Sequence, residues 1–258
     1  MIALVRNGFI SNPLKAQLML GFLLLFNSCT SFQDHYVISG NTMGTTYVVK
    51  IVAPDNDNEI GSIEKSIDSL LIQLNKQMST WDPKSEISQY NDWNSKVPFA
   101  VSDDFLNVVR KSITISEQTG GLFDPTVYDL MSLWGFGPNP KSDFPNLKDV
   151  HRTLGHTGID QFEITDSKLS KSNEKCKLDL NAIAKGYGVD KIFDFLNEKG
   201  FNNTFVEIGG EVKCSGKNRE NKYWSIGIEN PSGDGNYQKK ISAIISITNS
   251  AIATSGNY

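Results

Sequence analysis

The sequence predicts an α+β fold, in which mixed helices pack with a largely antiparallel sheet. Apolar residues recur at helical spacing in three long segments, and short runs rich in β-branched and aromatic residues, separated by Gly, Asn and Pro turns, follow the last of them. Helices and strands do not alternate regularly, which disfavours a repeated β-α-β architecture. A cleft is therefore expected between the helical and the sheet-rich parts.

The first elements are a strand and two helices. A strand is expected over 47–52, after a Gly- and Thr-rich turn at 40–46. Between 59 and 77, apolar side chains three and four residues apart predict an amphipathic helix with one buried face, made by Ile60, Ile63, Ile67, Leu70, Leu71 and Leu74. Ser102 is a favourable N-cap for a second helix, which should end at Gly120-Gly121 and bury Phe105, Val109 and Ile113.

The remaining elements follow a long loop. Pro and Gly crowd residues 135–145, which predicts a surface loop rather than a domain boundary. A third helix is expected over about 182–199, with Gly200 just past its end. Strands are then expected over 204–208, 223–229 and 239–248.

The charge balance limits the kinds of ligand. The 258 residues carry a formal net charge of −4, with 39% hydrophobic and 21% charged residues. No run of Lys and Arg interleaved with aromatics follows the chain, so a nucleic-acid partner is disfavoured. An anionic ligand would have to be held by backbone N–H groups, a few local cations or a metal ion.

The N-terminal segment has the pattern of an export signal. Arg6 and Lys15 precede an apolar stretch at 16–26, which is too short to span a membrane but suits a signal-peptide core. The stretch ends before Cys29, as at a bacterial lipoprotein site, although ordinary signal peptidase cleavage is an alternative. We therefore expect a lipoprotein signal peptide at 1–28, lipidation of Cys29 and a tether at 29–35. The protein should be exported and lipid-anchored to a bacterial membrane on its periplasmic side.

Two cysteines remain after Cys29. Cys176 and Cys214 lie in stretches that alternate like strands, with no short-spaced metal pattern near them. In an oxidising compartment they could form a disulfide. The alternative is two half-buried thiols that behave as small apolar residues.

The segment richest in candidate chemistry is 177–188. A strand brings Asp179 to the start of a helix, whose free N–H groups and dipole favour an anion such as a diphosphate, and Lys185 lies one turn inside. Backbone carbonyls at this turn could bind a hard cation. The alternative is that Asp179 and Asn181 only cap the helix.

Three further segments are weaker candidates by themselves. The turn 40–46 could wrap a ligand or simply precede a strand, and Trp81 could stack on a planar ring or plug the core. Asp124 is expected to be exposed beside Pro125. No G-x-G-x-x-G follows the first strand, no catalytic triad can be argued, and the three histidines form no ligand pair.

Taken in order, the motifs resemble those of the ApbE family, the FAD:protein FMN transferases, from about Tyr36 to Tyr258. They are Thr42-Met43-Gly44-Thr45, Met78-Ser79-Thr80-Trp81 with Ser85-Glu86, Gly120-Gly121-Leu122-Phe123-Asp124, Leu133-Trp134-Gly135-Phe136-Gly137, Asp179-Leu180-Asn181-Ala182-Ile183-Ala184-Lys185-Gly186-Tyr187, Gly209-Gly210-Glu211 and Ala253-Thr254-Ser255-Gly256-Asn257-Tyr258. The resemblance implies an ApbE-like fold with a flavin cleft over 36–258.

The resemblance also implies site residues. Those expected to contact FAD are Met43, Trp81, Leu122, Phe123, Asp124, Asp179 and Lys185, and the carbonyl of Ala182 is expected to be one Mg²⁺ ligand. The remaining Mg²⁺ ligands of the family would fall after Tyr258. The resemblance thus implies that the C-terminal part of the domain is missing and that the chain as given binds metal and catalyses poorly.

The implied reaction is an Mg²⁺-dependent transfer of the FMN moiety of FAD to a threonine of a target protein. A phosphoester bond forms and AMP is released. The acceptor implied by the family is a subunit of a membrane redox complex. Two alternatives use the same site: a periplasmic FAD pyrophosphatase that gives FMN and AMP, and a non-catalytic flavin-binding lipoprotein if 258 residues is the natural length.

Overall fold

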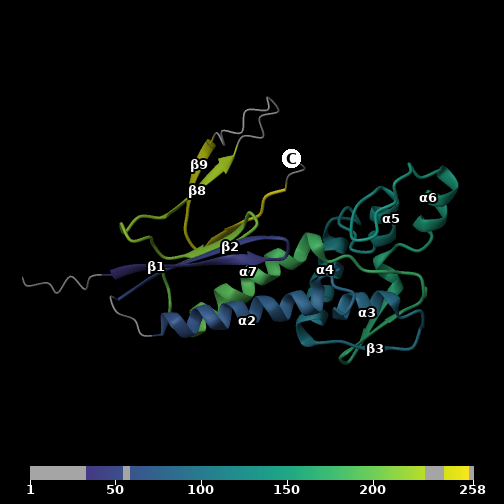
Figure 1. Cartoon of the computed structure of the whole chain (residues 1–258), viewed down its shortest axis with the longest axis horizontal. Coiled ribbons are helices and arrows are strands. Elements are labelled where there is room, and N and C mark those ends of the chain that lie inside the picture. Colours follow the sequence, from purple (N-terminus) through teal and green to yellow (C-terminus); the bar gives the residue numbers. More distant parts are fainter. Residues whose placement is uncertain (1–32, 55–58, 230–240, 256–258) are drawn as a thin grey trace, which may run out of the picture.

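The computed structural model describes residues 33–54, 59–229 and 241–255. The predicted signal peptide, Cys29 and residues 29–32 of the predicted tether lie outside this part. Its central sheet has five antiparallel strands in the order β1-β2-β6-β7-β10 (Figure 1). These are β1 (Gln33–Thr42), β2 (Thr45–Pro54), β6 (Thr204–Ile208), β7 (Glu211–Ser215) and β10 (Ser250–Ile252). Strand β1 thus includes the last three residues of the predicted tether, 33–35.

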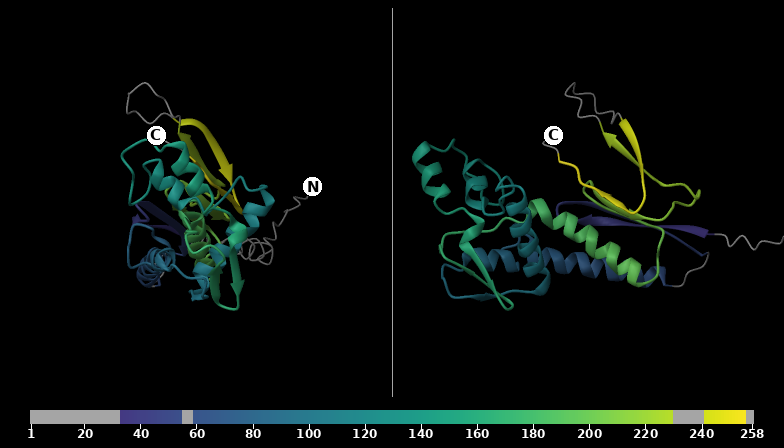
Figure 2. Two further views of the ribbon diagram at one scale, coloured as in Figure 1. Left: turned by 90° about the vertical axis from the view of Figure 1, so that its right-hand side faces the viewer. Right: turned by 180° about the vertical axis from the view of Figure 1, so that it is seen from behind.

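Two long helices cover one face of this sheet, as Figures 1 and 2 show. They are α2 (Ile60–Met78) and α7 (Asn181–Glu198). Ile63 and Ile67 of α2 and Ile192 of α7 pack on Val49 and Ile51 of β2 in one fully buried core. Since strand side chains alternate between faces, the odd-numbered residues of this part of β2 are the ones that pack against the helices.

The opposite face of the sheet carries a two-stranded hairpin, β8 (Trp224–Glu229) and β9 (Ile241–Ile247), which Figure 1 shows standing away from the helices. Val52, Cys214 and Trp224 form a small buried cluster beneath it. Ile241 and Ile244 of β9 are 60% and 69% exposed. The hairpin is therefore anchored mainly through β8.

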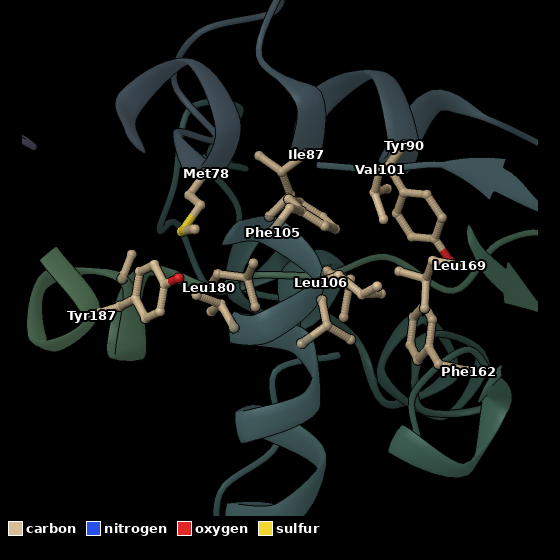
Figure 3. Packing of buried hydrophobic residues seen from close by; sticks show 14 of the residues in the cluster. Met78, Ile87, Tyr90, Val101, Phe105, Leu106, Phe162, Leu169, Leu180 and Tyr187 are labelled. Atoms are coloured by element: carbon tan, nitrogen blue, oxygen red, sulfur yellow. The ribbon is translucent and has the colours of Figure 1, made fainter. Parts of the chain in front are cut away.

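A second hydrophobic core lies beyond the sheet and is built around helix α4 (Asp103–Gln118), as Figure 3 shows. Phe105 and Leu106 occupy its middle, with Met78 and Tyr187 at one end and Tyr90 at the other. The surrounding elements are α3 (Glu86–Asp92), α4 (Asp103–Gln118), β3 (Phe99–Ala100), β4 (Phe162–Thr165) and β5 (Lys168–Lys171). Ser102 caps α4, because its side chain accepts from the Phe105 amide.

The outer lobe consists of short helices and the predicted loop. Its elements are α5 (Tyr128–Leu133), α6 (Leu147–Leu154) and the 3-10 turn η1 (Ile159–Gln161). No helix or strand is assigned over 134–146, which confirms the predicted loop at 135–145. Among the described residues, no helix is long and apolar enough to cross a bilayer.

The structure confirms the α+β class and the three long helices within one or two residues of their expected ends. The predicted strands correspond to β2, β6, β8 and β9. Strands β1, β3, β4, β5 and β10 and helices α3, α5 and α6 were not predicted. Each of these helices has eight residues or fewer, which is too short to show a clear helical period.

Cys176 and Cys214 are both buried and carry free thiols, so they form no disulfide in this structure. Cys214 lies in β7, as its alternating pattern predicts, whereas residues 176–180, which contain Cys176 and the strand predicted to bring Asp179 to the helix, form no strand. That part of the prediction is wrong. Burial raises the pKa of the Cys176 thiol to about 12, so this thiol stays protonated at neutral pH and packs as a small apolar group.

Candidate functional site

A cleft of about 350 Å³ lies where α2 and α7 pass from one core to the other. Residues Leu71 and Val189 belong to the sheet core, whereas Leu74 and Ala184 belong to the second core. The cleft is lined by Met43, Gly44, Leu74, Asn75, Met78, Ser79, Trp81, Asn181, Ala184 and Lys185. Three of the predicted site residues, Met43, Trp81 and Lys185, are thus brought together.

Met43 lies at the tip of the β1–β2 turn. It adopts a left-handed backbone conformation (φ 49°) and is followed by Gly44 (φ 73°), which gives a tight reversal. Asn75 of α2 donates to Thr42 Oγ1 at 2.9 Å, which ties the turn to the helix. A Cβ at Gly188 of α7 would lie 3.1 Å from the Ile208 Cδ1 atom and 3.4 Å from the Met43 Cε atom, so the glycine eases the packing of α7 on β6, and the turn touches it only at ordinary contact distance.

Trp81 follows the end of α2 and is 66% exposed. The expectation that it plugs the core is therefore wrong. Its side chain lines the cleft on one side and, on the other, a polar hollow of about 420 Å³ that also includes Tyr128, Asp129 and Lys177. An exposed aromatic face between two hollows is available for stacking on a planar ring.

Lys185 lies on the second turn of α7, on the side that faces the cleft. Its ammonium contacts Glu211 Oε1 of β7 at 2.9 Å, and the two side chains are 31% and 14% exposed. Asn181, at the first position of the helix, donates to Thr80 Oγ1 at 3.2 Å. The cleft therefore combines a lysine ammonium with the N-terminal end of a helix, an arrangement that favours phosphate oxygens.

Asp179 is half-buried just before α7. Its Oδ1 atom accepts from the Asn181 amide at 2.8 Å, so Asp179 caps a free amide of α7 from outside the helix, whereas the N-cap residue is Leu180 and the Asn181 side chain does not cap. Its own amide donates to Pro125 O at 2.7 Å, which joins the segment to residues 122–126. Burial raises the pKa of the Asp179 carboxyl above its usual value, and the described residues provide it with no ion-pair partner.

We predict that Asp179→Asn stabilises the fold at pH 7 and weakens FAD binding about tenfold, since one hydrogen bond to a charged acceptor is lost. A carboxyl whose folded pKa is raised destabilises the fold above that pKa, and this penalty disappears below the unfolded pKa of about 4. The stability gain should therefore shrink as the pH falls towards 4. Urea unfolding at the two pH values and titration with FAD measure the two effects.

The matched control is Asp143→Asn, since Asp143 is exposed in the 134–146 loop. It should change neither the free energy of unfolding nor the dissociation constant for FAD. A loss of stability at pH 7 in Asp179→Asn would show that the carboxylate is needed to cap α7, and would contradict the prediction.

The residues at 122–124 do not line the cleft. The Leu122 side chain is 92% exposed, and the Phe123 amide donates to Thr119 Oγ1 at 3.2 Å. Asp124 is half-buried rather than exposed as predicted, because its Oδ1 accepts from the Thr126 amide at 2.8 Å and from the Thr126 hydroxyl. The Pro125 carbonyl links this segment to Asp179 rather than to the cleft wall.

Ala182 lies exposed in the first turn of α7. Its carbonyl oxygen is a hard donor of the kind that Mg²⁺ prefers. Within the described ranges, no group of three or more His, Cys, Asp or Glu side chains could hold a metal ion. The Ala182 carbonyl therefore fits a role as one ligand to a phosphate-bound Mg²⁺. The described residues do not form a complete metal site around it.

Sequence reasoning gave no role to Glu211, although it belongs to the Gly209-Gly210-Glu211 motif, and did not single out Asn75. Glu211 directly follows Gly209-Gly210. A pair of glycines indicates a tight turn, and this turn could have been recognised as one that brings the Glu211 carboxylate to a site. Asn75 is a polar residue next to the buried face of α2, and its bond to Thr42 spans 33 positions. No local pattern reports such a contact.

Comparison with known proteins identifies the family. The model described as the ApbE family matches residues 43–258. The FAD:protein FMN transferase of Vibrio cholerae is 40% identical over 240 residues, which are 93% of this chain and 71% of that protein. Its namesake in Haemophilus influenzae is 37% identical over 231 residues, which are 86% of this chain and 65% of that protein.

Solved structures agree with this comparison. The flavin transferase ApbE from Vibrio cholerae superimposes with a TM-score of 0.80 at 40% identity, covering 87% of this chain and 72% of that one. The apo flavinyl transferase ApbE of Pseudomonas stutzeri gives a TM-score of 0.78 at 30% identity, covering 88% and 70%.

Proposed function

The chain belongs to the ApbE family, and from this premise we propose that it is an FAD:protein FMN transferase. The FMN moiety of FAD is transferred to a threonine hydroxyl of an acceptor protein, and AMP is released. The observation that carries the proposal is the cleft of about 350 Å³, because it joins an exposed aromatic face, a lysine ammonium and a helix N-terminus. A flavin dinucleotide has a planar ring and a diphosphate, which match these groups.

Each side chain has a distinct part in binding. Lys185 and the first amides of α7 bind the diphosphate, where charge-assisted hydrogen bonds are strongest. Trp81 stacks on a ring of the ligand, and Met43 closes the cleft from the β1–β2 turn. Asp179 accepts a hydrogen bond from a ring or sugar donor. Leu122, Phe123 and Asp124 remain expected FAD contacts through their link to Asp179, although they lie outside the cleft lining.

The transfer is a substitution at phosphorus. The threonine oxygen forms a bond to the FMN-side phosphorus, the bond from this phosphorus to the bridging oxygen breaks, and AMP leaves with the electron pair. The hydroxyl proton passes to solvent. Holding the diphosphate in line with the incoming hydroxyl contributes most, since positioning alone supplies about 7–11 kcal/mol.

We further propose that the reaction depends on Mg²⁺. When bound, the ion would neutralise charge on the pyrophosphate, and the Ala182 carbonyl would be one of its ligands. Mg²⁺ usually takes one or two protein ligands and completes its shell with substrate phosphates and waters. Ala182 is exposed in the first turn of α7, which leaves room for an ion beside it.

The cellular setting is also part of the proposal. The signal pattern at 1–28 and Cys29 supports export, with a lipid anchor to the membrane on the periplasmic side. An acceptor reached from that position would be a subunit of a membrane redox complex.

Incubating the purified full-length protein with FAD, Mg²⁺ and an acceptor protein that carries the target threonine tests the function. We expect covalent flavin on the acceptor, detected as in-gel fluorescence and as an added FMN mass, and none on an acceptor with Ala in place of the threonine. Free FMN without labelled acceptor would instead indicate hydrolysis. Unchanged FAD would reject both reactions.

A further inference from the structure

Three ion pairs link helix α7 to strand β7 in the described part of the chain. Lys185 of α7 contacts Glu211 of β7 at 2.9 Å, whereas Lys213 of β7 contacts both Asp190 and Asp194 of α7, at 2.8 Å and 3.7 Å. Only the first pair touches the cleft, because Lys185 lines it. Asp190 lies five residues further along α7 and also contacts Lys111 at 3.8 Å. The pair at the cleft and the pairs of Lys213 therefore join the same elements at different places.

The β6–β7 turn holds Glu211 rigidly. Gly209 and Gly210 have φ values of 55° and 96°, which make a tight reversal that other residues rarely adopt. The Gly209 amide donates to Thr46 O at 3.1 Å, and the Gly210 amide donates to Glu207 Oε1 at 2.7 Å. The turn that carries Glu211 is thus fastened to the strand that follows Met43.

The two oxygens of the Glu211 carboxylate differ in their surroundings. Oε1 accepts from Lys185, whereas Oε2 is buried and has no hydrogen-bond partner among the described residues. A buried charged oxygen without a partner is costly, and such groups in native proteins commonly serve a function. Among the described residues, the only hydrogen bond of the Glu211 carboxylate is the one to the Lys185 ammonium at the cleft.

We propose that Glu211 is a positioning residue for Lys185, which it holds at the cleft so that the ammonium meets the diphosphate of FAD. This inference rests on the proposed function. A lysine side chain has four rotatable bonds, and fixing it before the ligand arrives lowers the entropy lost on binding. Glu211 itself does not contact the reacting atoms.

The test compares Glu211→Gln with Asp190→Asn by calorimetric titration with FAD and by thermal unfolding. Each variant removes one carboxylate charge that joins α7 to β7, and in Asp190→Asn the Lys213 ammonium keeps its second partner, Asp194, at 3.7 Å. We expect Glu211→Gln to weaken FAD binding about tenfold, in line with the loss of a charge-assisted contact, and Asp190→Asn to leave it unchanged. Glu211→Asp, which keeps the charge, should recover part of the affinity.

Each outcome decides the inference. Equal loss of affinity in Glu211→Gln and Asp190→Asn would show that both pairs only dock α7 on the sheet, and would overturn it. Unchanged affinity in Glu211→Gln, with wild-type protein that binds and transfers flavin, would reject the positioning role alone. Wild-type protein that does not bind FAD would reject the proposed function together with this inference.

Discussion

Lys185→Met is expected to lower the affinity for FAD about 30-fold, because a charge-assisted hydrogen bond to phosphate contributes about 2 kcal/mol. Methionine has a similar length and apolar stem, so the change removes mainly the ammonium. Lys185 lines the cleft near the N-terminal end of α7, where the diphosphate is expected. Quenching of flavin fluorescence or calorimetric titration measures the affinity.

The matched control is Lys191→Met on the same helix. Lys191 is 39% exposed, against 31% for Lys185, and pairs with Asp104 at 3.1 Å away from the cleft lining. Its loss should leave FAD binding unchanged. Lys185→Met also leaves Glu211 without its cation, so stability needs a separate check: the double variant with Glu211→Gln should recover stability but not affinity. Equal affinities in the two lysine variants would contradict the assignment of Lys185.

Asn91→Ala is expected to destabilise the fold by about 3 kcal/mol, since it leaves two buried backbone groups without partners. Asn91 of α3 is 4% exposed. Its Nδ2 atom donates to Leu178 O at 2.8 Å, and its Oδ1 atom accepts from the Leu178 amide at 2.8 Å. This pair of bonds holds the extended segment that carries Asp179 to the start of α7.

Chemical denaturation at pH 7 measures the loss, and Asn94→Ala is the control. Asn94 is exposed, and its side chain donates only to the nearby Asp92 carbonyl at 3.2 Å. We expect a change of about 0.5 kcal/mol or less there. A similarly small change in Asn91→Ala would show that water replaces both bonds, and that Asn91 does not hold the segment.

The long helices could be predicted because their signals are local. Ile63, Ile67 and Leu71 fall on one face of α2 through spacing alone, and Ser102 caps α4 through its own side chain. The short helix α3 also has a serine cap, because the Ser85 side chain accepts from the Ser88 amide, but it is too short to show a helical period. Its seven residues are held by the burial of Tyr90 and by the Asn91 bonds to a segment 87 positions away.

Some features of the candidate site could likewise be predicted from local sequence, and others depended on the tertiary structure. The sequence by itself determined the α+β class, the helix that starts after Asp179 and, through ordered motifs, the family. Only the tertiary structure decided that Trp81 is exposed at a cleft rather than buried, and that Lys185 meets Glu211 26 positions later. The physical reason is range: periodicity and capping act within one or two turns, whereas a cleft forms where distant elements pack together.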